Sequence, residues 1–143
     1  MNAAPFAADG RGVYQLTVTM DFAAAHCLRH YGGPCENLHG HNFAVEAVVS
    51  GRKLEPKVDI LMDFKELKNR LAAVVAELDH CHLNELAVFA KRNPSSELIA
   101  RYIFEGLRER LADVPQVTLQ SVSVSEKASS KATYMEPDAG PAG

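Results

Sequence analysis

Two segments near the N-terminus alternate apolar and polar side chains with the two-residue period of a half-buried strand. Between residues 14 and 22 the even positions are apolar or aromatic and the odd positions are mostly polar. Between residues 39 and 49 the odd positions carry two histidines and then apolar side chains. The glycine- and proline-containing connection over 27–38 is too short for a crossover helix, so we expect the two strands to pair antiparallel.

Apolar residues recur at helical spacing in two later segments. The first predicts a helix over 63–78, with Asp63 and Glu66 forming a capping box at its start. The second predicts a helix that begins at Ser95 or Ser96. Each helix would have one apolar face, which we expect to pack against a sheet.

Residues 117–126 predict a last strand, whose alternation slips in phase between Leu119 and Val122, as at a β-bulge. Residues 57–62 are a weaker strand candidate. This order predicts an α+β fold in which two helices pack on one face of an antiparallel sheet. A sheet this small leaves open edges, and association into a homo-oligomer is one way to cover them.

Length and charge limit the classes of protein to consider. The 143 residues suit one domain, predicted over 1–136, with a disordered tail over 137–143 that ends in AGPAG. The net charge is −3 and no block of Lys and Arg marks a nucleic-acid partner. No apolar run approaches the roughly 20 residues of a membrane helix, and the N-terminus does not read as a signal peptide. We therefore expect a cytoplasmic protein.

The histidines are the strongest chemical signal. His39 and His41 lie two apart in a predicted strand and leave the same face, and His26 shares parity with the strand before it. Three imidazoles that converge suit Zn²⁺, with an open fourth position as in catalytic sites. The alternative is a closed structural zinc site in which Cys35 is the fourth ligand.

Three further positions are candidates, each with a simpler alternative. Cys35 near a divalent cation could act as a thiolate base, or it could be a small buried side chain. Asp79 beside His80 could orient the imidazole for proton transfer, or the pair could cap a helix end. Glu126 could accept two hydrogen bonds from the edge of a planar heterocycle, or it could be an exposed residue at a strand end.

Six short strings occur in order: FAAAH, CENLHGH, MDF, LDHCHLN, NPSSE and VSEK, between residues 22 and 127. Together they resemble the 6-pyruvoyl/6-carboxytetrahydropterin synthases. The resemblance implies a tunnelling fold assembled as a hexamer from two trimers, with Zn²⁺ on His26, His39 and His41. It further implies a pocket between subunits, proton transfer by Cys35, Asp79 and His80, and a pterin held by Glu126, with Glu97 as a second acidic residue.

The substrate implied by this family is 7,8-dihydroneopterin triphosphate. In CENLHGH, Cys35 precedes the first histidine of HGH by four residues, which resembles the bacterial branch that makes 6-carboxy-5,6,7,8-tetrahydropterin for queuosine. The pyruvoyl branch is the alternative. Glu36, which directly follows Cys35, suggests a dihydroneopterin-aldolase-like activity as a further alternative. A non-enzymatic zinc protein is the most distant alternative. Candidates for the triphosphate, none compelling, are Arg29, Lys91, Lys127 and Lys131.

Overall fold

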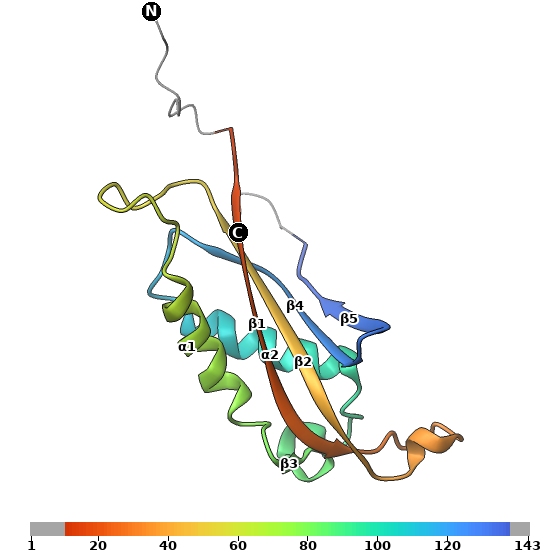
Figure 1. Ribbon diagram of the computed structural model, residues 1–143. Coiled ribbons are helices and arrows are strands. Elements are labelled where there is room, and N and C mark those ends of the chain that lie inside the picture. The colour runs from red at the N-terminus through yellow and green to blue at the C-terminus, as the bar shows by residue number, and fades with distance from the viewer. Residues whose placement is uncertain (1–10, 138–143) are drawn as a thin grey trace, which may run out of the picture.

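The two alternating segments form a long antiparallel hairpin, and both strands extend beyond their predicted ends (Figure 1). The computed structural model describes residues 11–137. In it β1 spans Tyr14–His26 and β2 spans His39–Gly51. The pairing is regular from Tyr14↔Gly51 to His26↔His39, so the alternation of sides continues without a break into the histidines.

The two helices lie close to their predicted positions. α1 spans Phe64–Val75 and α2 spans Ser96–Arg110, where the Ser95 side chain accepts a hydrogen bond from the Leu98 N–H as the N-cap. The predicted capping box of α1 is half correct. Asp63 caps the helix, but through the Lys65 N–H at 2.8 Å, whereas the Glu66 carboxylate pairs with Arg70 one turn later.

The remaining strands complete a five-stranded sheet in the order β3-β1-β2-β4-β5. β4 spans Thr118–Lys127 and has the predicted bulge, because Val48 and Val49 pair with Ser121 and Leu119 and leave one residue of β4 over. β5, Ser130–Tyr134, and β3, Cys81–His82, were not predicted, since five and two residues are too short to show a period.

Two details of the predicted architecture need correction. The weaker strand over 57–62 is wrong, because the segment is a turn closed by a single bridge between Glu55 and Ile60. The sheet is also not wholly antiparallel, because β3 follows the end of α1 and pairs parallel with β1 at Ala24 and Ala25. The α+β fold, with both helices on one face of the sheet, is confirmed.

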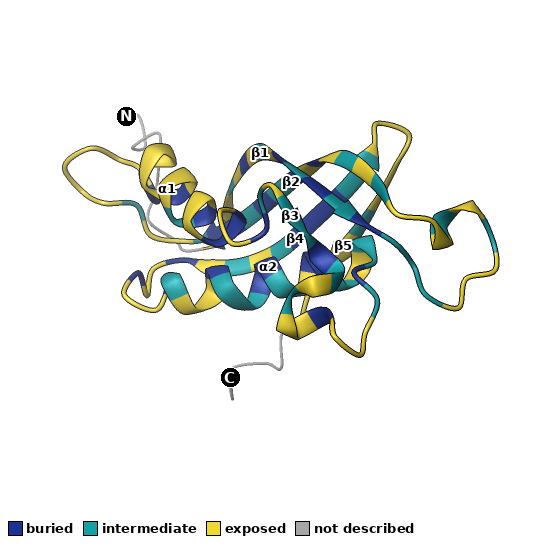
Figure 2. Ribbon diagram, turned by 90° about the horizontal axis from the view of Figure 1, so that it is seen from below, coloured by how far each residue is buried: buried dark blue, intermediate teal, exposed yellow. Residues whose placement is uncertain are grey.

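One hydrophobic core fills the space between sheet and helices, where Figure 2 shows the buried positions gathered. Phe22 and Phe43 stack across the hairpin with ring centroids 5.0 Å apart. Along the same inner face the next positions are Ala24 and the three histidines, so the apolar row gives way to imidazoles at one end of the sheet. The functional groups therefore stand on the most regular part of the fold.

Two further points concern the rest of the chain. No helix within residues 11–137 has the length and apolar character that crossing a membrane requires. Nearly all of the predicted tail, residues 138–143, lies outside the described residues. Among the described residues β5 has no strand beyond it, and the outer side of β1 is paired only at Ala24 and Ala25, by β3. Such edges are the ones that association with other copies would cover.

Candidate active site

Strand register brings the three predicted histidines together. His26 is the last residue of β1 and pairs with His39, the first residue of β2, while His41 pairs with Ala24. All three share the inner face with Phe43, whose ring meets those of His26 and His41 at centroid distances of 5.2 and 5.6 Å. His26 is fully buried, whereas His41 keeps 26% of its side chain exposed. The group is thus rooted in the core and open on one side.

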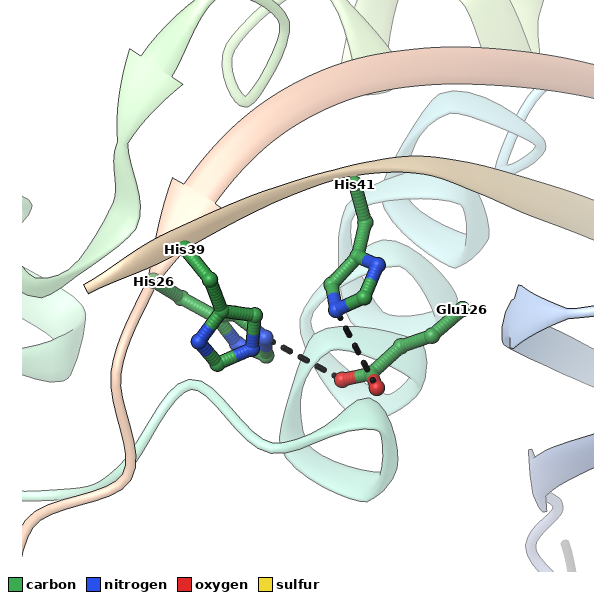
Figure 3. A group of neighbouring side chains, drawn as sticks. All are labelled: His26, His39, His41 and Glu126. Carbon is green, nitrogen blue, oxygen red and sulfur yellow. Dashed lines mark ion pairs between the residues drawn. The ribbon is translucent and has the colours of Figure 1, made fainter. Parts of the chain in front are cut away.

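A fourth side chain, Glu126 of β4, joins the histidines (Figure 3). Its two carboxylate oxygens lie 3.1 Å from Nε2 of His26 and 3.5 Å from Nε2 of His41. One potential ligand atom from each of the four residues lies within 4.8 Å of the others. Sequence reasoning gave Glu126 a different role. Its even position in β4, shared with the buried Val124, is the signal that could have placed it here.

Two main-chain carbonyls determine the tautomers of His26 and His39. Nδ1 of His26 lies 2.7 Å from the carbonyl oxygen of Pro94, and Nδ1 of His39 lies 2.7 Å from that of Asn37. A carbonyl oxygen only accepts, so each Nδ1 carries the hydrogen and each Nε2 presents a lone pair. This arrangement is typical of metal-binding histidines. Nothing in the sequence predicted either carbonyl.

The contact between His26 and Glu126 is itself evidence for a cation. Nε2 of His26 is buried and has no hydrogen-bond partner, although a carboxylate oxygen lies 3.1 Å away. Both atoms are acceptors when the ring is neutral, and burial lowers the pKa of His26 below its ordinary value of 6.5 despite the nearby carboxylate. A bound cation would satisfy both lone pairs. The residues present therefore fit a divalent metal with nitrogen and oxygen ligands.

Cys35 lies in the loop between β1 and β2, in a single 3₁₀ turn over Pro34–Glu36. It is not one of the four residues that converge, so among residues 11–137 the fourth group of the cluster is a carboxylate and not this thiol. The turn is attached to the end of β1, because the Leu28 N–H donates to the Cys35 carbonyl at 2.7 Å. The thiol is half-buried and free.

Asp79 and His80 lie just after α1, at the edge of β1. Asp79 accepts a hydrogen bond from the Ala23 N–H at 3.0 Å, which is the main cause of its lowered pKa. Nδ1 of His80 lies 3.1 Å from the same carboxylate, and its backbone has a positive φ of 59° that few residues other than glycine adopt. Among residues 11–137 the pair is not part of the group formed by the three histidines and Glu126. His80 instead lines an open hollow of about 600 Å³ that also borders His41.

Glu97 lies in the first turn of α2 and shares a pocket of about 290 Å³ with Glu126. Ser95, Ser96 and Lys131 line the same pocket. Glu126 therefore borders both this pocket and the histidine cluster. The role of each predicted site residue stays a prediction.

Arg29, a candidate for binding the triphosphate, has its side chain bonded to the protein's own main chain. Its guanidinium donates hydrogen bonds to three main-chain carbonyls, at 2.9 Å to Phe89, 3.2 Å to Arg92 and 3.3 Å to Asn84. A planar guanidinium with five N–H donors can bind several carbonyls at once. These hydrogen bonds give the Arg29 side chain a structural role in this protein.

The fold and the site together define a class of protein: a small α+β subunit with a histidine-rich, metal-competent centre at one end of its sheet, beside an acidic pocket. Comparison with known proteins gives the family. Residues 15–137 match the family described as 6-pyruvoyl tetrahydropterin synthase, and the chain belongs to this family. It is an enzyme of the pterin-synthase kind, of the lyase type.

Individual relatives agree with this assignment. A Synechocystis 6-carboxy-5,6,7,8-tetrahydropterin synthase is 40% identical over 84% of this chain and 92% of its own. A Pyrococcus furiosus dihydroneopterin monophosphate aldolase is 42% identical over 63% of this chain and 71% of its own. The solved structure of Caenorhabditis elegans 6-pyruvoyl tetrahydropterin synthase superposes with a TM-score of 0.77 at 25% identity, covering 87% of this chain and 96% of its own.

Proposed function

We propose that the protein converts 7,8-dihydroneopterin triphosphate and water to 6-carboxy-5,6,7,8-tetrahydropterin, acetaldehyde and triphosphate, as a step of queuosine biosynthesis in the cytoplasm. The observation that carries the proposal is the convergence of three histidines and Glu126 beside a pocket of the right kind for a pterin. The 40% identity to a relative named for this activity, over nearly its whole length, supports the proposed substrate class.

We propose His26, His39 and His41 as the ligands of Zn²⁺. When bound there, the ion would polarise a side-chain hydroxyl of the substrate. The protein's contribution is orientation: the carbonyls of Pro94 and Asn37 hold two of the rings with Nε2 directed inward. Burial keeps His26 neutral near pH 7, as a metal ligand must be.

The pterin ring would occupy the 290 Å³ pocket. A carboxylate there can accept two parallel hydrogen bonds from the 2-amino and N3–H edge of the ring, and both Glu126 and Glu97 are available. Because Glu126 also borders the histidines, a ring bound at this carboxylate would have its side chain close to them. Lys131, in the wall of the same pocket, is the basic residue best located for the triphosphate.

Proton transfer is assigned to Cys35, Asp79 and His80. The Asp79 carboxylate, 3.1 Å from Nδ1 of His80, would orient the imidazole for proton transfer. Asp79 and His80 do not line the pterin pocket of the same chain. We therefore propose a pocket completed between subunits of a homo-oligomer, a hexamer of two trimers, whose formation the open edges of β1 and β5 favour.

A second activity has specific support. The Pyrococcus furiosus relative at 42% identity is named a dihydroneopterin monophosphate aldolase. In this chain Glu36 follows Cys35 directly, and its carboxylate accepts a hydrogen bond from the Gly32 N–H at 3.1 Å. A carboxylate in this loop gives a second possible base, so cleavage of a dihydroneopterin phosphate is the alternative reaction.

The deciding experiment is incubation of the zinc-loaded protein with 7,8-dihydroneopterin triphosphate and identification of the pterin product by mass. We expect 6-carboxytetrahydropterin with acetaldehyde. 6-Pyruvoyltetrahydropterin would retain the family and overturn the branch. Turnover of dihydroneopterin monophosphate alone would favour the aldolase.

Cys35→Ala serves as the matched variant, since it should keep zinc and lose synthase turnover. Chelation distinguishes the catalytic site from a structural one. We expect it to abolish activity while circular dichroism retains the folded spectrum, whereas a structural zinc protein would unfold.

A further inference from the structure

Two asparagine side chains act as a substitute strand at the end of β1. Asn84 accepts from the Cys27 N–H at 2.9 Å and donates its own amide hydrogen to the Cys27 carbonyl at 3.0 Å. Asn93 does the same for the N–H and carbonyl of Arg29, at 2.9 and 3.0 Å. An antiparallel strand neighbour exchanges the same pair of hydrogen bonds with every second residue. The chain is thus held after the sheet has ended.

The segment that supplies these asparagines is fixed in turn by Arg29. Its guanidinium bonds to the carbonyls of Asn84, Phe89 and Arg92 and so ties residues 84–93 into one body. This segment contains only two short 3₁₀ turns, Leu83–Glu85 and Ala87–Phe89, so side-chain hydrogen bonds largely determine its shape. We call Arg29, Asn84 and Asn93 the clamp.

The clamp connects directly to two groups of the candidate site. Pro94, next to Asn93, provides the carbonyl that accepts from Nδ1 of His26 at 2.7 Å. Leu28 lies between the two residues that the asparagines hold, and its N–H donates to the carbonyl of Cys35 at 2.7 Å. Each of the four consecutive residues 26–29 therefore has a specific hydrogen bond in addition to the pairing of β1 with β2.

We propose that Arg29, Asn84 and Asn93 are positioning residues that orient the His26 ring for metal binding and fix the turn carrying Cys35. The loop over 27–38 leaves the end of the sheet (orange in Figure 1), beyond the reach of the strand hydrogen bonds. The loop has a few hydrogen bonds within itself, and the groups that attach its base to the rest of the protein include the clamp. The proposed orientation of the His26 ring is argued from the geometry alone, whereas the relevance of Cys35 to catalysis rests on the proposed function.

The test compares Asn84→Asp and Asn93→Asp with Asn69→Asp. Each of the first two keeps the accepting oxygen and turns a second oxygen toward a main-chain carbonyl. Asn69 is exposed on α1, so its variant adds the same charge away from the site. Metal-free proteins are titrated with Co²⁺ and followed by visible absorption. We expect about tenfold weaker binding in the two clamp variants, as for other residues behind metal ligands, and an unchanged affinity in Asn69→Asp.

A second readout is the alkylation rate of Cys35 by iodoacetamide, resolved from Cys27 and Cys81 by peptide mass. We expect a severalfold change in the clamp variants and none in the control. Unchanged Co²⁺ affinity and unchanged Cys35 reactivity in folded variants of lower stability would overturn the proposal, since the asparagines would then serve stability alone. If an aspartate variant fails to fold, Arg29→Lys replaces it, because lysine keeps the charge and loses the planar fork.

The two proposals can fail separately. Absence of turnover of 7,8-dihydroneopterin triphosphate by the wild-type protein would count against the proposed function. The Co²⁺ titration and the alkylation rates use no pterin, so they decide the positioning role in either case.

Discussion

Glu126→Gln tests the contact between the Glu126 carboxylate and Nε2 of His26. We expect this substitution to stabilise the metal-free protein and, if the carboxylate lies beside the ion, to weaken zinc binding. In the metal-free protein near pH 8, the carboxylate oxygen and the lone pair of His26 Nε2 face each other at 3.1 Å without a hydrogen between them. The glutamine amide can donate to that nitrogen. It would thus replace a contact between two acceptors by one hydrogen bond.

One net hydrogen bond contributes about 1 kcal/mol to the free energy of unfolding. For a domain of this length, that is a rise in Tm of roughly 3 °C. The assay is thermal unfolding in EDTA at fixed protomer concentration, because association would otherwise shift Tm. The gain should shrink as the pH is lowered and His26 becomes protonated, since the protonated ring can donate to the wild-type carboxylate. Glu109→Gln, an exposed position on α2, is the control for loss of a charge.

With metal present, the same variant separates two roles of Glu126. If the carboxylate lies beside the ion, zinc affinity should fall by about 10- to 100-fold. If it binds only the pterin, zinc affinity should be unchanged and KM for the pterin should rise. A metal-free Glu126→Gln protein that is no more stable than wild type at pH 8, while Glu109→Gln behaves as wild type, would refute the acceptor-to-acceptor contact.

Three other outcomes follow from single features. Burial lowers the folded-state pKa of His26 below 6.5, so the unfolded chain takes up a proton first as pH falls. The stability of the metal-free protein should therefore be complete above about pH 7 and decrease below 6.5, as urea titrations at several pH values would show. Gly51→Ala should destabilise by about 1–3 kcal/mol, because a Cβ there would lie 2.4 Å from the Gln116 carbonyl oxygen, and a wild-type urea midpoint would contradict this. Burial, with a hydrogen bond to Glu77, raises the pKa of Tyr102 to about 12. In an ultraviolet titration of tyrosine ionisation, Tyr102→Phe should therefore lack the one phenol that ionises near pH 12. Loss of the hydrogen bond should also lower the free energy of unfolding by about 1 kcal/mol.

Local periodicity predicted the larger elements because each is long enough to repeat its pattern. The β1 and β2 hairpin, both helices and the bulge in β4 all follow from alternation or helical spacing. The short strands β3 and β5 do not, since their partners rather than their own residues define them. The predicted strand over 57–62 failed because this segment pairs with no neighbouring strand: Leu61 and Met62 are buried in the core, whereas Val58 and Ile60 are exposed in a turn.

Part of the candidate site followed from the sequence in the same way. Parity alone places His39 and His41 on one face, and an unbroken β1 adds His26 to it. The six ordered strings gave the family, which the match over residues 15–137 confirms. The proposed roles of Cys35, Asp79, His80 and Glu97 depend on that resemblance and stay predictions.

The sequence by itself therefore determined which side chains leave each face and which family the chain belongs to, because both are encoded in the local order of residues. Only the tertiary structure decided which groups meet. Glu126 reaches the histidines because β4 lies beside β2, and Pro94, Asn84 and Asn93 reach the end of β1 because the segment after α1 returns there. The contacts of Pro94, Asn84 and Asn93 with the end of β1 join residues that are 57 to 68 positions apart, and those of Glu126 join residues still farther apart. They depend on the packing of the whole core, which no local pattern records.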